Sequence, residues 1–246
     1  MSSAHSGLRA CALACTLLLG ACAHQPQLAP LDPETIDRLP AYNRWMFGVN
    51  EKLDEYLLKP VAQGYQAVTP QFLDDGITNI FGNLADVPIG INNLLQFKFR
   101  EAAQDFTRIV FNSTFGLLGF FDVASYFGIP KHDEDFGQTL AHWGVGEGSY
   151  FVLPLLGPST LRDTGGLVVD AFNIDPVWEI DRIPVRNSLV ALRIVDERAD
   201  LLRSERVTEG ALLDRYTQIR DAWLQRRRSL IYDGNAPLEP RRLDVD

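Results

Sequence analysis

The chain has 246 residues and a formal net charge of −9, from 32 acidic and 23 basic side chains. An acidic chain without a long basic run is a poor partner for nucleic acid, and its charge alone would not draw it to anionic lipid. The length suits one sizeable domain.

The amino-terminal segment has the three parts of a secretory signal. Arg9 precedes an apolar stretch from Ala10 to Leu19, which is followed by small residues directly before Cys22. The string Leu19-Gly20-Ala21-Cys22 has the lipobox form, in which the thiol takes a diacylglycerol and cleavage exposes a new amino terminus for an N-acyl group. The apolar run is shorter than the ~20 residues of a membrane span, which disfavours an uncleaved anchor helix. The sequence therefore predicts a signal peptide over residues 1–21 and a lipid anchor at Cys22.

The rest of the chain divides into three further parts. Residues 22–40 are rich in Pro, Gln and Asp and are expected to form a lipidated tether. A helical domain is expected over residues 41–232, followed by a disordered tail over 233–246. Because Cys11 and Cys15 lie in the signal peptide, the mature chain has no disulfide and no thiolate metal site.

Apolar residues at helical spacing predict a series of helices. The first begins at Tyr42, carries an apolar stripe and ends at Pro60; the second runs from Pro70 to a break at Pro88. Further helices are expected at Lys98–Phe111, Asp135–Trp143 and Leu167–Phe172, and on two carboxyl-terminal stripes, Leu189–Leu202 and Leu212–Trp223. No segment alternates as a strand does and no internal repeat is visible, so the predicted class is all-α with a single helical domain.

A run of arginines closes the last helix, at Arg226, Arg227 and Arg228. Positive charge suits the negative end of a helix dipole, so a solvated helix end is the favoured interpretation. A nucleic-acid patch is less well supported, and a partner site facing the periplasm stays open.

Two short runs, Phe115–Phe121 and Tyr150–Pro158, combine large apolar side chains with Gly and Pro. That mixture breaks helices and is poorly solvated. The runs are either buried turns or segments that enter one membrane leaflet beside the lipid anchor, and neither could span a bilayer. The candidate residues for membrane or lipid contact are Phe115, Leu117, Leu118, Phe120, Phe121, Phe151, Leu153, Leu155 and Leu156.

Catalytic and metal-binding patterns are weak. The string His132-Asp133-Glu134-Asp135, with His142 nearby, could suggest a metal site, but its spacing matches no dedicated ligand pattern. A loop that caps a helix beginning near Phe136 explains it better. The chain has no Gly-x-Ser-x-Gly elbow, no histidine after His142 and no nucleotide loop, so we expect no enzyme activity, no metal and no cofactor beyond the acyl groups on Cys22.

A series of ordered strings lies between about Tyr42 and Pro176. They are Tyr42-Asn43-Arg44-x-Met46-Phe47-x-x-Asn50-x-x-Leu53-Asp54, Lys59-Pro60-Val61-Ala62-x-Gly64-Tyr65, Asn92-Asn93-Leu94-Leu95-Gln96, Asn112-Ser113-Thr114-x-Gly116, Phe121-Asp122-Val123-Ala124, Glu134-Asp135-Phe136-Gly137-Gln138-Thr139-Leu140, Trp143-Gly144-Val145-Gly146 and Leu153-Pro154-Leu155-Leu156-Gly157-Pro158-Ser159-Thr160-Leu161-Arg162-Asp163. Through these strings the chain resembles the MlaA/VacJ lipoproteins of Gram-negative outer membranes. One departure is Ser149, where the family commonly has Pro.

The resemblance implies a helical ring or disc in the inner leaflet of the outer membrane, facing the periplasm. It implies as partners membrane phospholipids, a trimeric outer-membrane porin and the periplasmic phospholipid carrier of the Mla system. The function that it implies is removal of stray phospholipid from the outer leaflet, which keeps the membrane asymmetric. The alternative is a structural lipoprotein that scaffolds porins or the envelope and has no lipid path.

Overall fold

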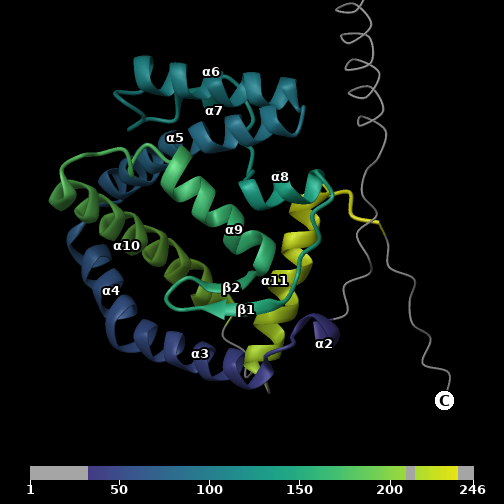
Figure 1. Ribbon diagram of the computed structural model, residues 1–246. Coiled ribbons are helices and arrows are strands. Elements are labelled where there is room, and N and C mark those ends of the chain that lie inside the picture. The colour runs from purple at the N-terminus through teal and green to yellow at the C-terminus, as the bar shows by residue number, and fades with distance from the viewer. Residues whose placement is uncertain (1–32, 209–213, 238–246) are drawn as a thin grey trace, which may run out of the picture.

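Almost all of the regular structure is helical. The computed structural model describes residues 33–208 and 214–237 (Figure 1). In chain order the elements are α2 (Pro33–Ile36), α3 (Pro40–Leu53), a π-helical turn (Asp54–Leu58), α4 (Lys59–Val68), α5 (Gln71–Leu95), α6 (Phe99–Phe115), α7 (Val123–Tyr126), α8 (Phe136–His142), β1 (Tyr150–Leu153), β2 (Gly157–Thr160), α9 (Leu161–Val169), a second π-helical turn (Asp170–Ile174), α10 (Ile183–Thr208) and α11 (Arg215–Ile231). The all-α class is confirmed, with one small hairpin added.

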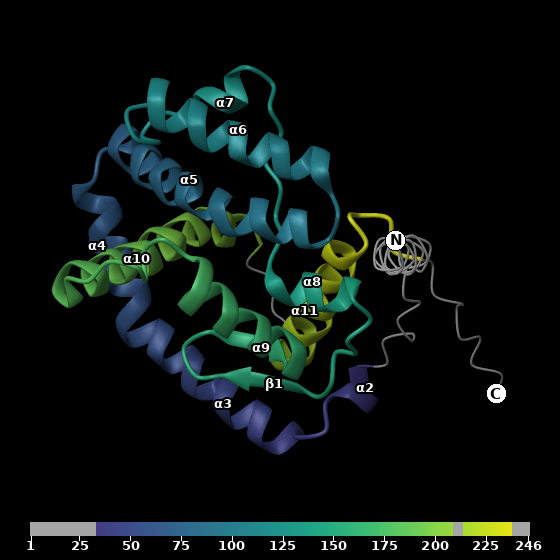
Figure 2. The same ribbon diagram turned by 45° about the horizontal axis from the view of Figure 1, so that its top comes forward.

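The helices follow one another around a closed circuit. The continuous rod of α3, the π-turn and α4 packs on α10, which packs on α5; α5 contacts α8, α8 contacts α11, and α11 returns to α2 at the start of the rod. The α5–α6 pair lies at one end of the molecule and the hairpin lies against α3 near the other, in both views (Figures 1 and 2). The chain therefore builds a ring of helices with α9 and the hairpin inside the circuit.

The first ordered element lies within the stretch expected to form the tether. Asp37, just after α2, is buried and accepts hydrogen bonds from the Tyr216 hydroxyl at 2.5 Å and from Arg220 Nη1 at 3.2 Å. The residues after α2 are thus fixed to α11. Cys22 and the signal peptide lie outside the described residues, as does the chain beyond residue 237.

Two predicted helix ends were wrong because both prolines are accommodated inside longer helices. Pro60 stands in the first turn of α4, where a missing amide hydrogen costs little, and the preceding π-turn lets the Lys59 amide donate to the Asp54 carbonyl. Pro88 lies inside α5, which packs along α6 and α10. Tertiary packing there outweighs the local cost of a proline.

Large apolar side chains of the rod are exposed while a polar one is buried. Trp45 of α3 and Tyr56 of the π-turn are 62% and 75% exposed, whereas the polar Asn43 is fully buried and the apolar Met46 is buried as well. Exposed large apolar side chains also occur along α5, α6 and the loops that follow them. Across the described residues, the buried set holds more polar and charged side chains than apolar ones, which is the reverse of the usual distribution.

The hairpin corrects the expectation that no strand is present. Tyr150 pairs with Thr160 and Leu153 with Gly157 in an antiparallel register. Tyr150 and Val152 are buried while Phe151 and Leu153 are half-buried, so the two faces differ. Because apolar residues occupy both faces, the sequence shows no alternation and the strand was missed.

Two asparagines of α3 act as a backbone partner for the free edge of β1. Asn43 Nδ2 donates to the Tyr150 carbonyl at 3.2 Å, and its Oδ1 accepts from the Val152 amide at 2.9 Å. Further along α3 and the hairpin, Asn50 donates to the Leu153 carbonyl at 2.8 Å and accepts from the Leu155 amide at 2.9 Å. Side chains thus satisfy the edge of a two-stranded sheet, which anchors the hairpin to α3.

A buried arginine joins α5, α6 and α7. Arg108 is 2% exposed, and its guanidinium donates to Asp86 at 3.3 Å and to both oxygens of Asp122 at 3.0 and 2.9 Å. Its remaining donors reach the Ser125 hydroxyl and the Ile129 carbonyl, so every N–H group has a partner. Burial acts to raise the pKa of Asp122, but hydrogen bonds from Ser125, Arg108 and Asn112 lower it to about 2.

Arg108→Met should lower the free energy of unfolding by about 3 kcal/mol, because the buried Asp86 keeps only Lys131 as a partner and Asp122 loses its bidentate one. Denaturant unfolding in detergent measures the change. Arg100→Met, at an exposed position one helical turn or more away on α6, serves as control and should cost less than ~0.5 kcal/mol. Equal costs for the two variants would contradict the structural role assigned to Arg108.

Candidate functional site

A hollow of about 870 Å³ lies between the α3–α4 rod, the hairpin turn, α10 and α11. Its wall mixes charged with apolar side chains. The charged ones are Glu51, Lys52, Asp54, Glu55, Lys59, Arg198 and Arg215, and the apolar ones include Phe47, Leu58, Leu155, Leu156, Leu201 and Ile219. A concave site of this size with both kinds of surface suits an amphiphile, a molecule with a charged end and an apolar end.

Two ion pairs span the hollow and fix its walls. Arg198 on α10 donates to Asp54 on the π-turn through two bonds, Nε to Oδ1 at 2.5 Å and Nη2 to Oδ2 at 2.7 Å. Arg215 at the start of α11 lies 2.9 Å from Glu51 on α3. The bidentate pair holds the rod to α10, while the more exposed Arg215–Glu51 pair adds less.

Charged side chains of the rod line the hollow, and large apolar ones are exposed outside it. Glu55 and Lys59 line the hollow, whereas Tyr56 and Leu57, adjacent to Glu55 in sequence, are large apolar side chains exposed elsewhere. Charged groups of the rod therefore share the wall of the hollow with Phe47 and Leu58, whereas Tyr56 and Leu57 are exposed away from it. Such a helix suits a body whose surroundings are less polar than its hollow.

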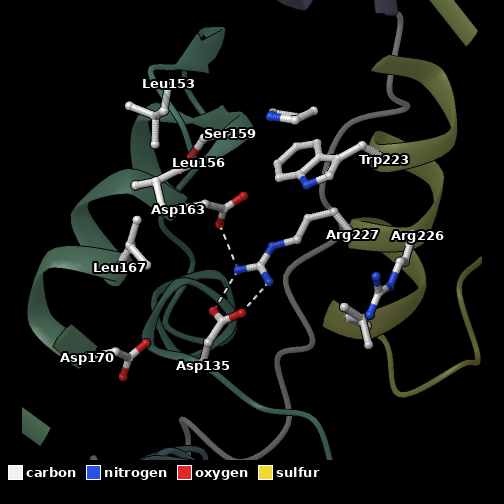
Figure 3. Close-up of a pocket in the computed structure, with 12 residues that line it drawn as sticks. Asp135, Leu153, Leu156, Ser159, Asp163, Leu167, Asp170, Trp223, Arg226 and Arg227 are labelled. Atoms are coloured by element: carbon white, nitrogen blue, oxygen red, sulfur yellow. Dashed lines mark hydrogen bonds and ion pairs between the residues drawn. The ribbon is translucent and has the colours of Figure 1, made fainter. Parts of the chain in front are cut away.

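A second hollow of about 290 Å³ lies on the other side of the hairpin turn (Figure 3). Leu156 and Pro158 line both hollows, so the hairpin turn separates them. The second is lined by apolar side chains of the hairpin, α9 and α11 around a charged centre, with Trp223 from α11 facing the hairpin and Arg227 reaching toward α9 (Figure 3).

Arg227 is the charged centre of this second hollow. It donates to both carboxylate oxygens of Asp135, one of them Oδ1 at 2.7 Å, and to Asp163 Oδ1 at 2.9 Å (Figure 3). Asp135 caps α8 by accepting from the Gln138 amide at 2.9 Å, as predicted. Burial acts to raise the pKa of Asp135, but Arg227 and the cap hold it below its usual range.

The interpretation of the arginine run as a solvated helix end was therefore wrong for Arg227 and holds for Arg226. Arg226 is 75% exposed at its side chain and lies 3.5 Å from Asp133. Arg227 is only 11% exposed and ties α11 to α8 and α9. A run of identical residues gives no sign of which one points inward, so the sequence could not separate them.

The histidine and acidic side chains of the segment near residue 132 contact different residues and do not converge. His132 Nδ1 lies 2.7 Å from Asp105, and Glu134 pairs with Lys98 at 2.7 Å. The ring of His142 packs near that of Phe97. Within residues 33–208 and 214–237, no three His, Cys, Asp or Glu side chains converge as a metal site.

The first apolar run stays exposed. It forms the turn after α6, where Leu117 and Leu118 adopt positive φ angles of 52° and 60° and are 69% and 78% exposed. Phe115 and Phe121 are exposed as well. Phe120 turns inward instead, since its ring lies where a Cβ on Gly76 would be, only 2.1 Å away.

The second apolar run forms most of the hairpin, and its side chains lie in different surroundings. Leu155 and Leu156 are exposed and line the larger hollow, and Leu153 lines the smaller one. Phe151 is half-buried and lines neither. The two runs thus lie in different parts of the molecule, one beside α5 and one against α3 (Figure 2).

Sequence reasoning missed the charged lining of the larger hollow. The sequence patterns assign no role in binding to Lys52, Glu55 or Lys59. Their spacing of three and four positions was the available signal, since it puts them on one side of a helix.

These features define a class: a helical ring around a hollow of mixed polarity, with apolar side chains on its outer surface. Among the described residues, no helix is both long and apolar enough to cross a bilayer. A family model, the MlaA lipoprotein, matches residues 35–230. The chain belongs to the MlaA lipoprotein family.

Relatives support this assignment over most of the chain. The "Intermembrane phospholipid transport system lipoprotein MlaA" of Escherichia coli (strain K12) is 36% identical over 225 residues, which are 89% of this chain and 86% of that protein. The protein of that name from Haemophilus influenzae is 33% identical, covering 91% and 90%. An uncharacterised protein of Rickettsia bellii is 31% identical, covering 80% and 78%.

The fold has a counterpart among solved structures. A structure from work on the "Structural basis for maintenance of bacterial outer membrane lipid asymmetry" superposes with a TM-score of 0.69 at 30% identity. The match covers 79% of this chain and 98% of that one. The similarity therefore extends over nearly the whole of the solved chain.

Asp170 gives the smaller hollow a pH dependence that can be measured. Burial raises its pKa to about 6, against hydrogen bonds from the Phe136 amide and Asn92 that act to lower it. Since this exceeds the unfolded value of about 3.9, its stabilising contribution is complete below about pH 4 and is lost as the pH rises through 6.

Asp170→Asn cannot titrate. The stability of the wild type relative to this variant should therefore fall between about pH 4 and pH 6.5 and be constant outside that window. Free energies of unfolding measured at several pH values in detergent test this. Parallel profiles for the two proteins across the whole range would show that Asp170 is not the group that titrates.

Proposed function

We propose that this protein removes mislocalised phospholipids from the outer leaflet of the outer membrane and passes them toward a periplasmic lipid carrier. The observation that carries the proposal is the rod, whose charged residues Lys52, Glu55 and Lys59 line the larger hollow, while its aromatic residues Trp45 and Tyr56 are exposed and do not line it. A phospholipid resists crossing hydrocarbon chiefly because its charged headgroup loses hydration. A hollow lined by charged groups replaces that hydration and lowers the barrier.

The outer surface supports a location within a leaflet. Exposed aromatic and aliphatic side chains of the rod, of α6 and of the loop at Leu117 and Leu118 would be in contact with lipid. Polar groups are held inside by pairs such as Arg108 with Asp122, as backbone and side chains in hydrocarbon require. We propose attachment to the periplasmic side of the outer membrane through acyl groups on Cys22.

The names of the relatives agree with this role, since those from Escherichia coli and Haemophilus influenzae are called lipoproteins of an intermembrane phospholipid transport system. Transport of this kind breaks no covalent bond, so no catalytic residue is required and we propose that the protein is not an enzyme. We propose a trimeric porin and a soluble periplasmic lipid carrier as further partners.

Deleting the gene in the native bacterium tests the function. Surface-exposed phospholipid and sensitivity to detergent should both rise, and the intact gene should restore them. Unchanged lipid exposure would contradict the proposal. A porin scaffold without a lipid path predicts instead that defects follow loss of porin binding, so co-purification of the porin is measured in the same strains.

Membrane contact by the loop after α6 is a separate prediction. A mature chain with Cys22→Ser should still bind phospholipid vesicles, and adding Leu118→Asp should weaken that binding by about tenfold or more, because an apolar contact is replaced by a charge. Since Leu118 is 78% exposed, stability should change by less than about 0.5 kcal/mol.

Vesicle flotation provides the measurement. Asn187→Asp adds the same charge at an exposed polar position near the start of α10 and should leave binding unchanged. If the Leu118 and Asn187 variants float equally well, the loop does not enter lipid.

A further inference from the structure

We infer that Lys52, Glu55 and Lys59 bind the lipid headgroup in the larger hollow, with the lysines contacting the phosphodiester and Glu55 contacting a primary ammonium group. The inference rests on the proposed function and names the headgroup class that the same site selects. The preferred cargo is then a zwitterionic phospholipid of the ethanolamine type.

The three side chains lie along one side of a continuous helix. Lys52 is in α3, Glu55 in the π-turn and Lys59 at the start of α4, and all three line the hollow. Their separations of three and four positions bring successive side chains near each other on a helix surface. The π-turn between them is a geometry that proteins often use at functional sites.

The other charges of the hollow are already engaged. Arg198 pairs with Asp54, and Arg215 pairs with Glu51. Within the described part of the chain, no ion pair or side-chain hydrogen bond occupies Lys52, Glu55 or Lys59. The charges that remain for a ligand are therefore two positive and one negative.

This remaining pattern matches a phosphodiester that carries an amine. The negative phosphate lies between positive charges, and the ammonium meets a carboxylate that can accept its hydrogen bonds. A headgroup that ends in hydroxyls would offer Glu55 hydrogen bonds but no positive charge. A quaternary amine would reach Glu55 without donating a hydrogen bond.

The apolar part of the wall indicates that the ligand is a lipid and not a small phosphate. Leu58, Leu155 and Ile219 line the same hollow as the charged residues. A free headgroup would leave this apolar surface in contact with water, whereas acyl chains would cover it. Lipid and water-soluble headgroup share their polar chemistry, so the experiment compares both.

The experiment uses the mature lipidated protein in mixed micelles that contain phosphatidylethanolamine and phosphatidylglycerol in equal amounts with identical acyl chains. Bound lipid is counted by native mass spectrometry. The wild type should bind more of the ethanolamine lipid. Glu55→Gln should lower the ratio of ethanolamine to glycerol lipid by roughly two- to fivefold, the scale of one partly exposed charge pair. Lys59→Gln should lower binding of both lipids and keep their ratio.

Matched controls lie on α6, outside the hollow. Glu101→Gln and Arg100→Gln change the same charges and should alter neither total binding nor the ratio. Glycerophosphoethanolamine at the lipid's concentration should not displace bound lipid; if it does, the ligand is the free headgroup and the inference is overturned.

Different outcomes would contradict the lipid path and the headgroup assignment. A wild type with no bound phospholipid would contradict the lipid path itself, whereas a Lys59→Gln variant that binds as much lipid as the wild type would overturn the role assigned to Lys59. A wild type that binds lipid with a ratio unchanged by Glu55→Gln would leave the lipid path standing and overturn the headgroup assignment.

Discussion

The structure depends on one constraint: polar groups must find their partners inside the protein. Arg108, Arg227 and Asn43 are each buried or nearly so, and each joins elements that are distant in sequence through several hydrogen bonds. In water such groups could remain solvated at little cost. In hydrocarbon an unpaired polar group loses its hydration without compensation, so it has to be paired within the protein. Packing by polar networks frees the apolar side chains to face outward.

This inversion connects the fold to the site. Because Asn43 and Asn50 bind the edge of β1, the hairpin turn is fixed between the two hollows and Leu156 lines both. Because Arg198 holds Asp54, the π-turn keeps its charged side toward the larger hollow. Under the proposed function, the same contacts that stabilise the ring would determine where a charged headgroup meets the protein and where acyl chains lie.

Helical character, the cap at Asp135 and the family were predictable from sequence, because they rest on local pattern or on ordered motifs. The surroundings of each helix face were not predictable, because periodicity identifies an apolar stripe without showing whether the stripe faces a protein core or lipid. The same limit applies to Arg227, whose carboxylate partners are 64 and 92 positions away in sequence. The helix ends predicted at Pro60 and Pro88 were wrong because tertiary packing outweighed the local cost of a proline in a helix.

The central claim is that adjacent residues of the rod face water-filled and lipid environments, and site-directed spin labels at positions 55 and 56 test it most directly. With Cys22 acylated and residues 1–21 removed, as proposed, the chain has no other cysteine, so each single cysteine variant takes one label. In native-like bilayers, a label at Glu55 should be accessible to a water-soluble nickel relaxant and a label at Tyr56 to oxygen dissolved in the lipid. Equal accessibility of both positions to the nickel reagent would contradict the account.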